Sequence, residues 1–131
     1  MTPKFHVLFA DDIRTEMNGK LFIVGAYTGG LSAPMPSTSP LSYLIEISGL
    51  TEGKHSVKFV IELEAGGKLT FDGHADVLKA DETVFITFAG APMSYTEPGV
   101  LTVTANIDGV DYLAGSLNIQ QMEQPGSDTP T

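Results

Sequence analysis

The sequence contains neither cysteine nor tryptophan, and it has few basic residues. Without cysteine the chain can form no disulfide, thiolate metal site or thiol nucleophile, which excludes zinc ribbons and cysteine proteases. Seven basic residues face 16 acidic ones, so the formal net charge is −9. Because this charge repels phosphate backbones, we expect no nucleic-acid partner.

Long hydrophobic runs are also missing. The longest nearly apolar run, residues 21–27, is far shorter than the ~20 residues of a membrane helix, and the N-terminus lacks the apolar core of a signal peptide. We therefore expect a soluble, cytoplasmic protein that does not bind a membrane. A length of 131 residues is typical of one domain.

What the sequence does contain is short runs of β-branched and aromatic residues, separated by many of its 14 glycines and eight prolines. Helical periodicity is weak throughout, so the pattern predicts an all-β fold. The expected strands span about residues 4–10, 20–29, 42–49, 55–65, 69–79, 83–89, 100–107 and 111–120.

Several turns can be placed between these strands. Asn18-Gly19 and Asp108-Gly109 are hairpin signals. In the last strand, the alternation places some apolar residues on one face and some on the other, and a bulge at Gly115 or a three-residue turn would bring them to the same face. After residues 56–65, parity requires an odd loop, which we place at residues 66–68. This register pairs Leu63 with Phe71 and sets Lys58 opposite Asp76.

Two segments are expected to lie outside the strands. Residues 30–40 contain three prolines and no charge, which predicts an extended crossover loop. Residues 122–131 are polar and predict a flexible C-terminal tail, so the single domain should span residues 1–121.

Residues 5–27 (FHVLFADDIRTEMNGKLFIVGAY) and 97–119 (EPGVLTVTANIDGVDYLAGSLNI) resemble an uncharacterised bacterial family of proteins of about this length. The resemblance implies an immunoglobulin-like antiparallel β-sandwich of about seven to eight strands. It implies no activity and no catalytic residue. Since the disulfide and the tryptophan of antibody domains are absent, aliphatic and phenylalanine side chains must hold the two sheets together.

Two acidic clusters could bind a cation. Asp11, Asp12 and Glu16 lie in one short segment, and carboxylates of this kind bind calcium, although Asp-Asp at a strand end with Arg14 nearby is more typical of a turn. In the second cluster, Asp72, His74 and Asp76 share one face of a strand. They could form a mixed oxygen and nitrogen site, but side chains on a flat strand diverge, and a solvated face is the favoured interpretation.

Two loops are candidate recognition surfaces. The first spans residues 34–40 and contains Met35; the second spans residues 90–98 and contains Met93 and Tyr95. Loops on a rigid scaffold often bind partners, and methionine and tyrosine provide adaptable contact area. The alternative is that these side chains only close the ends of the core.

No catalytic motif is present, and neither His6 nor His55 belongs to a triad pattern. We therefore predict a non-catalytic protein without a cofactor, acting as a protein-interaction or assembly module in a bacterial cell or a phage particle. Exposed sheet edges would also allow a homo-oligomer. The alternatives are a small-ligand or carbohydrate-binding domain and a metal-dependent hydrolase that uses an acidic cluster.

Overall fold

The computed structural model describes residues 2–122, and within them it consists of nine β-strands and no helix. The strands are β1 (Lys4–Thr15), β2 (Leu21–Tyr27), β3 (Leu31–Ala33), β4 (Ser37–Ser48), β5 (Gly53–Leu63), β6 (Lys68–Val77), β7 (Val84–Tyr95), β8 (Gly99–Ile107) and β9 (Val110–Gln121). Residues 123–131, nearly all of the expected tail, lie outside the described residues.

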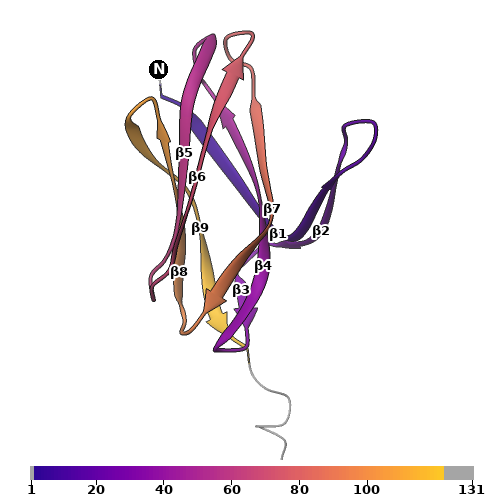
Figure 1. Ribbon diagram of the computed structural model, residues 1–131, viewed down its shortest axis with the longest axis vertical. Helices are drawn as coiled ribbons and strands as arrows, with labels where there is room; N and C mark the ends of the chain where they lie inside the picture. Colours follow the sequence, from indigo (N-terminus) through magenta and orange to yellow (C-terminus); the bar gives the residue numbers. More distant parts are fainter. Residues whose placement is uncertain (1, 123–131) are drawn as a thin grey trace, which may run out of the picture.

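The strands form two sheets that enclose one main core (Figure 1). The four-stranded sheet has the order β2-β1-β4-β7, and the five-stranded sheet has the order β3-β9-β8-β5-β6. Neighbouring strands are antiparallel except β3 and β9, which are parallel. The expectation of an all-β fold is thus confirmed.

Aliphatic and aromatic side chains fill the space between the sheets. Tyr43 on β4 and Phe59 on β5 are almost completely buried, and each ring contacts another aromatic ring edge-on, Phe9 for Tyr43 and Phe88 for Phe59. Edge-to-face contacts of this kind add stabilisation beyond the area that they bury. The other fully buried large side chains are Tyr95, Leu41, Ile45, Ile47, Ile61, Leu101 and Val103.

Three strand boundaries differ from the sequence prediction. β1 continues to Thr15 and β7 to Tyr95, whereas we expected them to end near residues 10 and 89. An extra residue in β7 opposite β4 lets pairing continue past Gly90, a bulge that the sequence pattern does not reveal. The predicted crossover loop at residues 30–40 is also wrong in part, because β3 and the start of β4 lie in it.

The β5–β6 hairpin has the predicted parity but a different register. The loop has three residues, as expected, yet it consists of residues 64–66, because the Gly66 N–H donates to the Leu63 carbonyl and the Leu63 N–H donates to the Gly67 carbonyl. Phe71 therefore pairs with Phe59 instead of Leu63. Gly66 and Gly67 both have φ near +115°, so the glycines form the end of the turn.

The β8–β9 hairpin follows the prediction. Ile107 pairs with Val110, which leaves Asp108 and Gly109 as a two-residue turn with positive φ at both positions. The register shifts after Val103, which pairs with Gly115, so the bulge expected at Gly115 is present.

Candidate functional site

A hairpin at one edge of the four-stranded sheet extends away from the core. We call residues 11–27 the arm; they comprise the second half of β1, the turn and β2, and they extend to the right of the core in Figure 1. In the arm, Ile13 and Leu21 join Ala10 and Leu44 in a small second cluster of apolar side chains, and Tyr27 packs against the main core. Between Leu21 and Tyr27, the residues of β2 are exposed.

Apolar side chains project from both faces of β2 into solvent. Phe22 is 52% exposed, Ile23 37% and Val24 41%, and Met17 in the turn is fully exposed. The nine exposed large hydrophobic side chains of residues 2–122 thus include four on the arm. Scattered exposed hydrophobic residues are normal, whereas grouped ones are typical of interaction surfaces.

The base of the arm is held by polar contacts. The Tyr27 hydroxyl donates to the Asp11 carboxylate across β1 and β2. Partial burial, with this hydrogen bond, raises the pKa of Tyr27 to about 12. Gly25 has φ +65°, and a Cβ there would lie 2.4 Å from Asp11 Oδ2, so the carboxylate occupies the space of the missing side chain. The contacts fix the arm where it leaves the sheet.

The other sheet edges are protected in ways that β2 is not. β3 has only three residues, and β6 exposes Asp72, His74 and Asp76. The second half of β7 is interrupted by its bulge and contains Pro92. Its first half, Val84–Phe88, is uncharged and pairs with β4 without interruption, and there Phe88 stacks on Phe71 of β6. Short length, charged side chains, bulges and proline are the devices by which edge strands avoid pairing with other chains. β2 contains no charge and no proline, and its register with β1 is continuous from Leu21 to Val24.

The first acidic cluster does not form a shared site. Asp11 and Asp12 lie within β1, so the expected turn at Asp11-Asp12 is wrong, and the two side chains have different partners. Asp11 accepts a hydrogen bond from Tyr27, whereas Asp12 accepts one from Arg14 Nε at 2.8 Å. The Arg14 hydrogen bond lowers the pKa of Asp12. Glu16 lies beyond β1, in the turn of the arm.

Asp72, His74 and Asp76 share the exposed face of β6, as predicted. Within residues 2–122, however, no three histidine, aspartate or glutamate side chains are grouped so that they could hold a metal ion. The pairing with β5 sets Lys58 opposite Asp72 and Lys54 opposite Asp76. The prediction that Lys58 faces Asp76 is therefore wrong, because the hairpin turns two residues earlier than expected.

The predicted recognition loops are not both loops. Met93 and Tyr95 lie in β7 and are 3% and 1% exposed, because the strand continues past the bulge and their side chains point into the core. The expectation that they provide contact surface is wrong. Met35 lies between β3 and β4 and is half-buried against the core.

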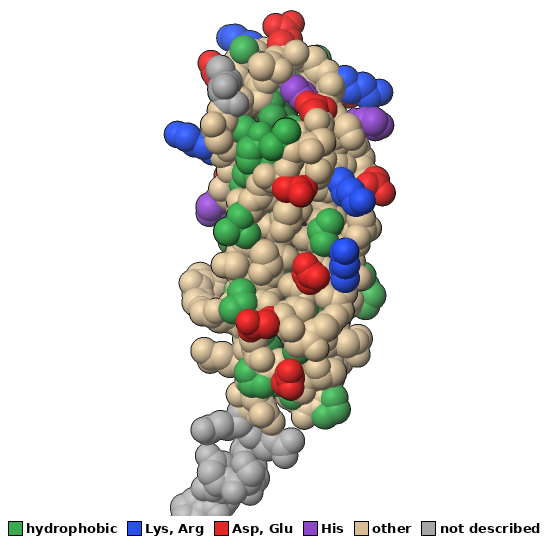
Figure 2. Space-filling model, turned by 90° about the vertical axis from the view of Figure 1, so that its left-hand side faces the viewer, with side chains coloured by type: hydrophobic (Ala, Val, Ile, Leu, Met, Phe, Trp, Pro, Cys, Tyr) green, Lys and Arg blue, Asp and Glu red, His purple; other side chains and the backbone are tan. Residues whose placement is uncertain are grey.

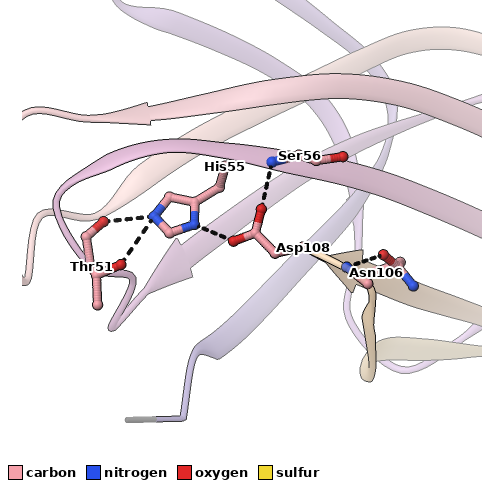
Figure 3. Close-up of polar contacts among 6 residues, drawn as sticks. Thr51, His55, Ser56, Asn106 and Asp108 are labelled. Carbon is pink, nitrogen blue, oxygen red and sulfur yellow. Dashed lines mark hydrogen bonds and ion pairs between the residues drawn. The ribbon is translucent and has the colours of Figure 1, made fainter.

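A hydrogen-bond network that the sequence did not reveal surrounds His55 (Figure 3). Nδ1 of the 8% exposed His55 lies 2.6 Å from Asp108 Oδ2, and Nε2 lies 2.7 Å from the Thr51 carbonyl oxygen. The second Asp108 oxygen accepts a bond from the Ser56 N–H. The hydrogen bonds to the Thr51 carbonyl and the Asp108 carboxylate raise the pKa of His55, and the hydrogen bond from His55 lowers the pKa of Asp108.

Both nitrogens of this imidazole face an acceptor, so the favoured form is the protonated ring, which donates from each. Such a ring has no free lone pair for general base catalysis. The network instead ties the β4–β5 connection to the β8–β9 turn, two segments about fifty residues apart. No local pattern around His55 signals a partner at that distance.

A surface groove lies between β1 and β9. Its volume is about 400 Å³, and it is lined by residues 6–9, 27–29 and 116–118. His6 is the lone ionisable side chain here apart from Tyr27, and it is 70% exposed and 3.7 Å from Glu46. The other polar side chains in its lining are those of Thr28, Ser116 and Asn118.

The face opposite the arm differs from the arm itself. Figure 2 shows acidic and basic side chains spread along this face, with hydrophobic side chains in small separate groups. Charge of this kind keeps a surface hydrated and disfavours broad apolar contact.

No family model matches the chain, and no curated protein matches it. A solved structure similar to it is the X-ray structure of Northeast Structural Genomics Consortium target SoR45, with 15% sequence identity and a TM-score of 0.45 over 95% of this chain and 89% of that chain. Within residues 2–122 there is no helix that could cross a membrane.

Proposed function

We propose that this protein is a non-catalytic interaction or assembly module of a bacterial cytoplasm or a phage particle, built as an immunoglobulin-like β-sandwich. Its binding element is the arm, and the binding mode is the addition of a partner strand to the free edge of β2. The observation that supports this most strongly is that, among the edge strands of residues 2–122, β2 alone combines an uncharged, continuous edge with exposed apolar side chains on both faces.

Strand addition fits this edge physically. Backbone N–H and C=O groups of an added strand satisfy those of the free edge, and side chains beside it determine specificity. Cross-strand pairs of aromatic and β-branched residues each contribute about 0.2–1 kcal/mol. Phe22 and Val24 on one face and Ile23 on the other are residues of this type. The tightly closed base of the arm presents them in one geometry, which lowers the entropy lost on binding.

Photo-crosslinking in the native host tests the proposal. A benzophenone amino acid is placed at Phe22 or, as a matched control, at Phe85, which is 57% exposed on β7. We expect a discrete protein conjugate from position 22 that position 85 does not give. Adding Ile23→Lys to the same chain should abolish the conjugate, because the charge disrupts pairing at the edge. Equal labelling from both positions, or a conjugate that persists with Ile23→Lys, would contradict the proposal.

A further inference from the structure

We infer that the strand added to β2 is β2 of a second copy of this chain, in antiparallel pairing about a two-fold axis at Ile23. This inference rests on the proposed function, because it names the partner of the same edge. It would join two four-stranded sheets into one continuous sheet, with the central order β1-β2-β2-β1.

Symmetry limits the possible registers. Residues directly opposite each other in an antiparallel pair share a face of the sheet. A two-fold axis perpendicular to the sheet also maps each residue onto its own copy on the same face. The axis must therefore pass between a residue and its copy, and the uninterrupted part of β2 offers Leu21, Phe22, Ile23 and Val24 as centres.

The pairing centred at Ile23 makes the best use of the apolar side chains. It sets Ile23 opposite its copy and Phe22 opposite Val24 of the second copy, twice by symmetry. A centre at Val24 would set Phe22 opposite Ala26, and a centre at Phe22 would set Val24 opposite Lys20. A centre at Leu21 would bring Lys20 of each copy opposite Phe22. The register at Ile23 is therefore the one in which all three exposed apolar residues of β2 meet apolar partners.

The charge distribution favours a second copy as the occupant. A two-fold interface must be complementary to itself, so any charge near its axis meets a like charge. No charged residue lies between Lys20 and Glu46, so β2 can pair with itself without such repulsion. The chain as a whole has a net charge of −9, none of it in β2, and this charge would make two copies repel each other. Since the arm extends away from the core (Figure 1), β2 can pair while the acidic surfaces stay apart.

Disulfide trapping tests the partner and the register together. The chain has no cysteine, so Phe22→Cys, Ile23→Cys, Val24→Cys and the control Phe85→Cys each introduce a single thiol. Opposite residues have Cα atoms about 4.5–5.5 Å apart, within the reach of a disulfide. We expect Ile23→Cys to form a covalent dimer under mild oxidation faster than the other three. Equal rates at positions 23 and 85 would overturn the inference, and a faster dimer at 22 or 24 would overturn the register.

A charge exchange provides a second test that does not depend on oxidation. In sedimentation equilibrium from about 1 µM to about 1 mM, the unmodified chain should approach twice its mass of 13.9 kDa. Ile23→Lys and Ile23→Glu should each remain monomeric, and their equimolar mixture should form a dimer, because opposite charges then meet at the axis. Phe85→Lys should dimerise like the unmodified chain.

The two proposals can fail separately. An unmodified chain that stays monomeric over the whole range, or a Lys–Glu mixture that stays monomeric although the unmodified chain dimerises, would overturn the inference. If Phe22 nevertheless crosslinks to a different protein in the host, the second copy is excluded while strand addition to the arm stands. If no position on the arm crosslinks and the chain is monomeric, both proposals are wrong.

Discussion

Replacing His55 with alanine should destabilise the fold in a way that depends on pH. The side chain is 8% exposed and makes two short hydrogen bonds, one to the Asp108 carboxylate and one to the Thr51 carbonyl. A bond between charged groups contributes about 1.5–3 kcal/mol, and one to a neutral carbonyl about 1 kcal/mol. Because the Asp108 side chain is 51% exposed and can rehydrate, the lower end applies to that bond.

The expected loss for His55→Ala is therefore about 2.5 kcal/mol near pH 6, where the imidazole is protonated. For a domain of this size, ~1 kcal/mol corresponds to about 4 °C, so the melting temperature should fall by roughly 10 °C. His74→Ala is the matched control, because His74 is exposed on β6. Its effect should stay within about 0.5 kcal/mol.

The sign of the pH dependence follows from the direction of the shift. The pKa of His55 is raised above its ordinary value of 6.5, so its contribution is fully present below pH 6.5 and is lost as the pH rises through the folded-state pKa. The pKa of Asp108 is lowered, so its contribution is present above pH 3.8 and is lost as the pH falls through its folded-state pKa. The pair is thus most effective between these two transitions.

Urea unfolding at about pH 6 and about pH 9 measures this contribution directly. The free energy of unfolding of the unmodified protein should be lower at about pH 9 than at about pH 6, and the decrease should be much smaller for His55→Ala. If the variant retained the whole alkaline loss, the protonated ring could not be the source, and our account of the network would be wrong.

Three further changes have outcomes that the structure determines. Tyr43→Phe should raise the free energy of unfolding by about 1 kcal/mol in urea titrations, because the buried Tyr43 hydroxyl has no hydrogen-bond partner among residues 2–122; a loss of stability would show that the hydroxyl is satisfied. Gly25→Ala should cost about 1–3 kcal/mol in the same titration, since φ is +65° and Asp11 occupies the space, whereas Gly73→Ala meets nothing within 4 Å and should be neutral or slightly stabilising. Calcium or zinc at about 1 mM should leave the melting temperature unchanged, because the carboxylates of Asp11, Asp12 and Glu16 do not converge; a rise would restore the metal-site interpretation.

Local patterns predicted much of the fold. Alternation and turn residues identified the all-β class, the Asp108-Gly109 hairpin and the bulge at Gly115, since each depends on residues close together in the chain. The β5–β6 turn lies two residues earlier than expected, which shifts every pairing partner by four residues, because two glycines can form either the start or the end of a three-residue loop. The alternation of faces along the two strands requires an odd number of loop residues but does not fix which residues form the loop. The backbone hydrogen bonds of Leu63 determine that.

The candidate site was predicted less well, for a different reason. Met93 and Tyr95 looked exposed because Gly90 and Pro92 are typical of loops, yet pairing with β4 carries the strand through them. The run without charge from Leu21 onward was visible, but such a run can equally be a buried strand. Whether β2 is covered depends on where β1 stops pairing with β4, which is after Ala10, and this is a tertiary property.

Charge and the arm together explain how such an edge can persist without general aggregation. An unprotected apolar strand is normally a site of uncontrolled pairing. Here it belongs to a molecule of net charge −9, and repulsion between exposed charges acts over about 8–10 Å at physiological ionic strength. Approaches that bring two acidic surfaces together are disfavoured, whereas an approach through two extended arms keeps those surfaces apart. A two-fold contact also uses up both free edges, so the assembly closes at two copies and does not grow. The net negative charge would thus restrict association to β2.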